Sequence, residues 1–168
     1  MNITLIGMPG AGKSLIGKAV ACRMNLRLID TDELIRQRTG LTIGENLAKL
    51  GDEKFIQLEE QVVLNLGNFE NCVVSPGGSV VYSTNAMDFL KQRSVVIFLQ
   101  VPLEVIFKRV DPQRGVVRLR DKTLPDLFNE RLPLYEKYAD KTIFADREVR
   151  FVAEEIEGIM KSYGEGTG

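Results

Sequence analysis

The stretch ITLIGMPGAGKSLIGKAVA (residues 3–21) decides how the rest of the chain is interpreted. A short apolar run leads into a glycine-rich turn and then into a helix-period pattern. Gly7, Gly12, Lys13 and Ser14 match G-x-x-x-x-G-K-[ST], between a predicted strand and a predicted helix. Such glycines let backbone N–H groups turn toward phosphate oxygens, and the following helix adds the positive end of its dipole. The stretch therefore predicts a nucleoside triphosphate site.

The motif also predicts which residues contact the nucleotide. We expect Lys13 to reach the β- and γ-phosphates and Ser14 to help bind Mg²⁺. The predicted nucleotide-binding residues are Gly10, Ala11, Gly12, Lys13, Ser14 and Leu15. The alternative is a glycine-rich turn with a solvated lysine.

Composition narrows the functional class. The 168 residues predict a single domain, 1–168, and 44% hydrophobic with 27% charged residues is typical of a globular protein. The net charge of -1 gives no reason to expect nucleic acid, and the absence of histidine removes His-based catalysis. Cys22 and Cys72 lie in apolar stretches and are predicted to be buried. There is no basic n-region and no run near the roughly 20 apolar residues of a membrane span, so we expect a cytoplasmic monomer without a membrane partner.

Strand and helix patterns alternate along the chain. Strands are predicted at residues 3–6, 26–29, 72–75, 95–99 and 141–144. Helices are predicted at residues 13–24, 32–38, 42–50, 53–66, 84–92, 103–110, 124–138 and 149–162. This alternation predicts a three-layer α/β fold, with a parallel sheet between two helical layers. The charged segment DPQRGVVRLRDKT (residues 111–123) is either a solvated loop or a mobile lid over an anionic ligand.

Two further clusters follow predicted strands. Asp30 and Asp32 come directly after the second strand, at the edge where α/β proteins bind ligands. Asp30 is a candidate for holding a Mg²⁺-bound water and Asp32 for accepting the proton of an attacking hydroxyl. The alternative is that one of these side chains only caps the next helix. Gly77 and Gly78 follow the third strand, where bare backbone can lie against a substrate. The chain lacks the N-K-x-D motif of GTPases and is short for a motor ATPase, which leaves a small kinase.

The chain as a whole resembles the shikimate kinase family. The segments that carry the resemblance are GMPGAGKSLIGKAVA, DTDELIRQRTGLTI, GDEKFIQLEEQVV, SPGGSVV, QRGVV and NERLPLYEKYAD. The resemblance implies a P-loop kinase fold with a five-stranded parallel sheet. It also implies ATP with Mg²⁺, and phosphoryl transfer to the 3-hydroxyl of shikimate, a small-molecule substrate, in aromatic amino acid biosynthesis.

The resemblance also assigns roles by position. Lys13 and Ser14 would serve the phosphates and the metal, with Asp30 near Mg²⁺. Catalysis would involve Lys13, Asp32 and the lid residue Arg114. Acceptor binding would involve Asp32, Gly77, Gly78 and Arg131, with Arg131 on the carboxylate, and the acceptor-binding region would span about residues 32–66.

Three positions depart from the family pattern, all on the acceptor side or in the lid. Ile56 stands where a carboxylate-binding arginine is expected, the triple glycine reads Pro76-Gly77-Gly78-Ser79, and Gly115 replaces a proline in the lid. Two alternatives therefore stay open: a related kinase with a different hydroxyl acceptor, and a nucleotide-binding regulator that transfers no phosphate.

Overall fold

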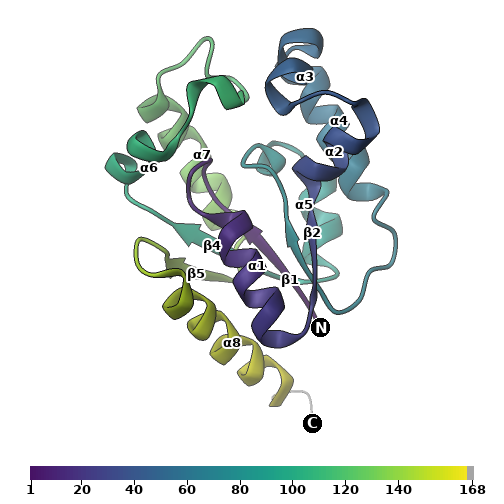
Figure 1. The fold of residues 1–168 in the computed structure, drawn as a ribbon, viewed down its shortest axis with the longest axis vertical. Helices are drawn as coiled ribbons and strands as arrows, with labels where there is room; N and C mark the ends of the chain where they lie inside the picture. Colours follow the sequence, from purple (N-terminus) through teal and green to yellow (C-terminus); the bar gives the residue numbers. More distant parts are fainter. Residues whose placement is uncertain (166–168) are drawn as a thin grey trace.

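The structure is a computed structural model that describes residues 1–165; the end of the predicted GEGTG tail, residues 166–168, lies outside it. A five-stranded sheet with the order β2-β3-β1-β4-β5 forms its centre, and every pairing is parallel (Figure 1). The strands are β1 (Asn2–Ile6), β2 (Arg27–Asp30), β3 (Cys72–Ser75), β4 (Val95–Gln100) and β5 (Lys141–Phe144). The predicted parallel α/β sheet is confirmed.

The central strands are apolar because helices cover both of their faces. The four inner residues of β4 are all buried, which explains why this strand shows no alternation in its sequence. Helices α1 (Lys13–Met24) and α8 (Val149–Glu165) pack side by side on one face. Helices α5 (Thr84–Lys91) and α7 (Leu124–Tyr138) contact β4 from the other face. The result is the predicted three-layer arrangement.

Three helices follow β2 and form a smaller unit at one end of the sheet. They are α2 (Thr31–Thr39), α3 (Ile43–Leu50) and α4 (Asp52–Leu64). Thr42 and Glu45 form a reciprocal capping box at the start of α3. The unit has its own apolar cluster, made of Ile35, Ile43, Leu47, Phe55, Ile56, Val62 and Val117. Val117 comes from the charged segment at residues 111–123, so the middle of that segment packs against this unit.

The remaining elements connect the layers. Helix α6 (Leu103–Arg109) follows β4, and two short 3₁₀ turns are η1 (Val80–Tyr82) and η2 (Pro112–Arg114). Helix and strand limits agree with the sequence predictions to within three residues, α8 being the element that extends furthest past its predicted end. Within residues 1–165, no helix has both the length and the apolar character needed to cross a membrane.

The prediction that both cysteines are buried is wrong for Cys22. Cys72 is fully buried in β3, but Cys22 is exposed on α1. The face that α1 buries consists of Ile16, Gly17, Val20 and Ala21, and Cys22 falls just outside it. An apolar neighbourhood in sequence therefore did not indicate which helical face the thiol occupies.

Candidate active site

The turn between β1 and α1 forms a cradle that ends at the N-terminus of α1. Gly12 precedes the helix with φ 90°, a left-handed conformation that favours glycine. The Lys13 ammonium donates hydrogen bonds to the carbonyls of Gly7 (2.8 Å) and Met8 (2.9 Å). Burial lowers the pKa of Lys13 to about 8. The cradle therefore brings a partly desolvated cation to the positive end of a helix, which is an arrangement suited to phosphate.

Asp30 connects this cradle to the next strand. Its Oδ1 atom accepts hydrogen bonds from the N–H groups of Asp32 (3.0 Å) and Glu33 (3.3 Å), so Asp30 caps α2. Its Oδ2 atom accepts a hydrogen bond from the Ser14 hydroxyl at 3.0 Å. The capping role and the proposed metal-side role are thus compatible, because the cap uses one oxygen and leaves the other facing Ser14.

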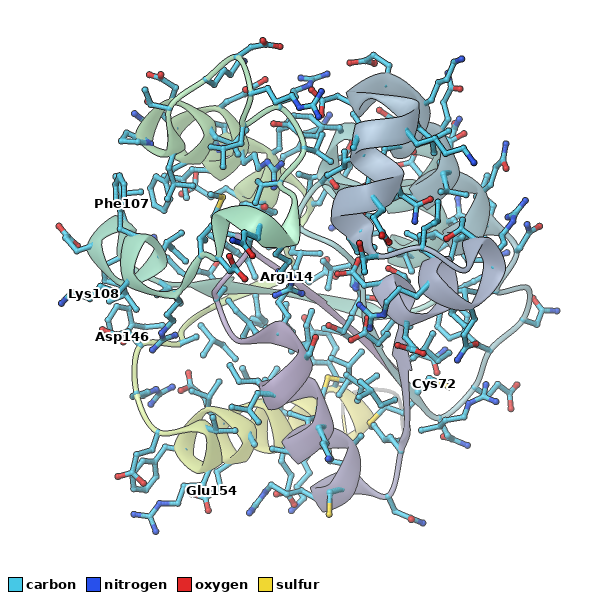
Figure 2. The ribbon with its side chains drawn as sticks, turned by 45° about the horizontal axis from the view of Figure 1, so that its top comes forward. Cys72, Phe107, Lys108, Arg114, Asp146 and Glu154 are labelled. Carbon is cyan, nitrogen blue, oxygen red and sulfur yellow. The ribbon has the colours of Figure 1, made fainter. Side chains whose placement is uncertain are left out.

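Asp32 lies on the other side of the same turn. Burial and the neighbouring Asp30 carboxylate raise its pKa. Its Oδ2 atom is 3.4 Å from Nη2 of Arg114, which reaches across from η2. Figure 2 shows Arg114 between η2 and the start of α1. The structure therefore brings Lys13, Asp32 and Arg114 together around one space.

Gly77 and Gly78 border this space with bare backbone. A Cβ atom on Gly77 would overlap Oε1 of Glu59 and lie 3.1 Å from Oδ1 of Asp32. A Cβ on Gly78 would lie 2.9 Å from Cδ of Pro9 and 3.0 Å from Nη1 of Arg131. Any side chain at either position would displace these groups, so both glycines are required by close packing.

Arg131 is buried to 1% exposure on α7. Its Nε–H donates to the Tyr82 hydroxyl (3.2 Å) and its Nη2 group donates to the Val117 carbonyl (3.0 Å). Its Nη1 atom is buried and has no hydrogen-bond partner within residues 1–165. A buried guanidinium with one unpaired nitrogen and no carboxylate partner is costly, so this side chain is suited to an anion.

Glu59 on α4 is a second buried charged group, with 3% exposure. The Ser79 hydroxyl donates a hydrogen bond to its Oε2 atom. Burial raises the pKa of the Glu59 carboxyl to about 7. The sequence reasoning did not single out Glu59. The available signal was a glutamate on the same helical face as Phe55, Val62 and Val63, where the other residues are apolar.

These groups line one cavity of about 420 Å³. The lining includes the cradle and Ser14, together with Asp32, Glu59, Gly77, Gly78 and Arg131. Arg114 and residues 115–117 cover it, and Arg109, Ala145, Arg147 and Val149 lie along a further edge. The cradle and the Arg131 guanidinium thus line the same space, together with the carboxyl groups of Asp32 and Glu59.

Comparison with known proteins identifies this arrangement. Residues 9–161 match the family model described as shikimate kinase. A shikimate kinase from Caldanaerobacter subterraneus subsp. tengcongensis is 34% identical over 160 residues, which are 92% of this chain and 93% of that protein. The chain belongs to the shikimate kinase family.

Other members of this family agree with that placement, and a more distant kinase shares the fold. A shikimate kinase from Haemophilus influenzae is 36% identical over 88% of this chain and 84% of that protein. The structure of a shikimate kinase from Acinetobacter baumannii in complex with shikimate has a TM-score of 0.88 at 32% identity, covering 96% of this chain and 93% of that one. A deoxyadenosine kinase from M. mycoides, with a TM-score of 0.63 and 14% identity, shares the fold alone, over 96% of this chain and 100% of that one.

The structure also shows where the departures from the family pattern lie. Ile56 is 9% exposed within the apolar cluster of the α2–α4 unit, and it is not part of the cavity lining described above. Ser79 binds Glu59, and Gly115 adopts φ 82° with its Cα packed against Gly44 at the start of α3. Each departure therefore has a packed place in the fold, and none leaves a gap at the cavity.

Proposed function

We propose that this chain transfers the γ-phosphoryl group of ATP to the 3-hydroxyl of shikimate, giving shikimate 3-phosphate and ADP. The observation that carries the proposal is the buried guanidinium of Arg131, which has one nitrogen without a hydrogen-bond partner within residues 1–165 and lines the same cavity as Asp32 and the phosphate cradle. A hydroxy acid needs both groups: an arginine for its carboxylate and a carboxylate near the hydroxyl that reacts.

The geometry of the cradle suggests which residues bind the nucleotide. In the proposal, residues 10–15 hold the phosphates, with Lys13 at the β- and γ-phosphates and Ser14 and Asp30 on the metal side. Ser14 and Asp30 offer oxygen atoms 3.0 Å apart, and no larger cluster of acidic or thiol ligands exists in the described part of the chain. This sparse oxygen set fits Mg²⁺, which kinases bind through one or two protein groups plus phosphates. Bound there, Mg²⁺ would neutralise charge that develops on the phosphates.

The acceptor side uses other groups that line the same cavity. Asp32 would accept the proton of the attacking hydroxyl, and its raised pKa makes it a better base than an ordinary aspartate. Arg131 would bind the carboxylate through Nη1, and the backbone of Gly77 and Gly78 would lie against the ring. We assign residues 32–66 to acceptor binding because Asp32, Phe55 and Glu59 from this region line the cavity.

We also propose that residues 111–123 act as a lid within a single domain. Arg114 pairs with Asp32 across 3.4 Å, and its own side chain is more than half exposed. Such a pair contributes little stability, so Arg114 is free to exchange Asp32 for the γ-phosphate when substrates bind. That exchange would release the Asp32 carboxylate for the acceptor hydroxyl and would exclude water from the reaction.

The alternatives from the sequence are less well supported. Ile56 replaces an arginine without opening a gap in the cavity, and Arg131 still provides a buried cation for a carboxylate. The relatives named above are shikimate kinases, which favours shikimate over another acceptor. A regulator that transfers no phosphate would not need Asp32 and Arg131 to converge on the phosphate cradle.

The test is coupled ADP release with ATP and Mg²⁺, comparing shikimate with its methyl ester. We expect shikimate-dependent turnover, and a KM about tenfold or more higher for the ester, because the ester cannot form a charged hydrogen bond to Arg131. Equal KM values for acid and ester would remove Arg131 from the proposed role. ADP release that does not depend on shikimate would contradict the proposed reaction.

A further inference from the structure

The guanidinium of Arg131 is held from two sides by neutral oxygen atoms. Tyr82 accepts from Nε at 3.2 Å, and the Val117 carbonyl accepts from Nη2 at 3.0 Å. Within residues 1–165 no ion pair joins Arg131 to a carboxylate, although the charge of Arg131 partly offsets the raised pKa of the buried Glu59 carboxyl. Because both acceptors are neutral, they fix the orientation of the guanidinium without neutralising its charge. The positive charge therefore stays available for an anion at Nη1.

Tyr82 is itself firmly placed, although it lies behind the cavity lining. Its ring packs against the apolar cluster that contains Ile56 and Val117. The guanidinium of Arg118 lies 4.2 Å from the centre of the same ring, within the range of a cation–π interaction. The phenol oxygen is thereby held at one position beside Nε of Arg131.

Arg118 is in turn anchored to two helices. Its guanidinium pairs with Glu53 on α4 (3.2 Å) and Glu130 on α7 (3.0 Å), and its backbone N–H donates to Asp52 (2.9 Å). Arg118 has φ 66°, a left-handed conformation uncommon for arginine, which these contacts stabilise. The support of Tyr82 therefore extends from the lid segment to α4 and α7.

We infer that Tyr82 is a positioning residue for acceptor binding, whose hydroxyl aims the Nη1 group of Arg131 at the acceptor carboxylate. This inference rests on the proposed function, in which Arg131 binds that carboxylate. A long arginine side chain loses rotamer freedom when it binds an anion, and holding it in place beforehand removes part of that loss. Since Ile56 adds no second guanidinium, acceptor affinity depends on how well Arg131 is aimed.

The variant Tyr82→Phe isolates the hydroxyl, because it keeps the ring, its packing and its contact with Arg118. We expect KM for shikimate to rise about tenfold, while kcat and KM for ATP stay within about twofold. Tyr163→Phe, which removes an exposed phenol on α8, is the matched control and should leave all three constants unchanged. An unchanged KM for shikimate in Tyr82→Phe would overturn the inference.

A double-mutant cycle separates positioning from a merely structural effect. Lysine at position 131 has no Nε–H for Tyr82 to hold. In an Arg131→Lys background, Tyr82→Phe should therefore raise KM by less than about twofold. If the effects of the two substitutions on KM for shikimate instead multiply, Tyr82 acts independently of Arg131 and the inference fails.

A measurement without acceptor distinguishes failure of this inference from failure of the proposed function. In ¹⁵N-arginine-labelled protein, the Nε–H signal of Arg131 is assigned by its loss in Arg131→Lys. Its hydrogen exchange should be about tenfold faster in Tyr82→Phe than in the wild type. Unchanged exchange would overturn the positioning role. Faster exchange in a protein that releases no ADP with shikimate would support the contact but overturn its assignment to shikimate binding and, with it, the proposed function.

Discussion

Replacing Glu59 with glutamine should stabilise the protein at neutral pH and leave its stability unchanged in mild acid. Burial raises the pKa of this carboxyl from 4.5 to about 7. Between these values the folded protein keeps the proton while the unfolded chain has released it. The unfolded state therefore binds fewer protons, and the free energy of unfolding falls as the pH rises from about 4.5 to about 7.

The size of the effect follows from the width of this window. A span of roughly 2.5 pH units, at about 1.4 kcal/mol each, corresponds to about 3 kcal/mol. Glutamine carries no titrating proton, and its amide oxygen can still accept the hydrogen bond from Ser79. The Glu59→Gln protein should match the wild type near pH 4.5 and exceed it by up to about 3 kcal/mol at pH 8. For a chain of this size that difference raises Tm by roughly 6–12 °C.

The assay is urea unfolding followed by circular dichroism, at pH values from 4.5 to 8.5, for wild type and variant. Glu136→Gln, which makes the same substitution at an exposed position on α7, is the matched control. A difference between wild type and Glu59→Gln that does not change with pH would show that Glu59 titrates normally. That result would refute the argument from burial.

Three further predictions concern the reaction and the lid. Lys13→Met should abolish phosphoryl transfer in a protein that unfolds normally, because Lys13 supplies charge at the γ-phosphate; near-wild-type turnover would contradict its role. Asp32→Asn should lower kcat about a hundredfold or more while changing ATP affinity less than about threefold, measured by steady-state kinetics and calorimetry; equal losses would place Asp32 on the metal. Gly115→Ala adds a Cβ only 2.7 Å from Cα of Gly44 at φ 82°, so it should loosen the lid and speed its hydrogen exchange. Gly158→Ala, with no neighbour within 4 Å, is the control and should leave lid exchange unchanged.

The sequence was sufficient for the fold because its signals are local. The run from residue 3 into the Lys13 helix, the unbroken apolar strands and the helix periods each depend on neighbouring residues, and all strands lie within two residues of their predicted limits. The phosphate cradle could also be predicted from local sequence. Asp30 and Asp32 could be placed because they follow β2, and the carboxyl ends of parallel strands border the ligand cavity in this type of fold.

The acceptor side was harder to predict because its contacts join distant segments. Glu59 becomes a buried acid only where α4 meets Ser79 after β3, and Tyr82 matters only because α7 brings Arg131 beside it. Neither contact can be predicted from the helix or strand periodicity of the sequence. The error at Cys22 has a related origin, since a one-residue change along a helix turns a side chain from the core to the solvent. Local patterns specify elements, whereas the pairing of single polar groups depends on the packing between elements.

The most direct test of the account is the identity of the product. Purified protein with ATP, Mg²⁺ and shikimate is followed by ³¹P and ¹H NMR until ATP is consumed. The account predicts one equivalent of shikimate 3-phosphate per ADP, with a phosphorus coupling on the proton at carbon 3. ADP with free phosphate and unmodified shikimate, or no consumption of ATP, would contradict it.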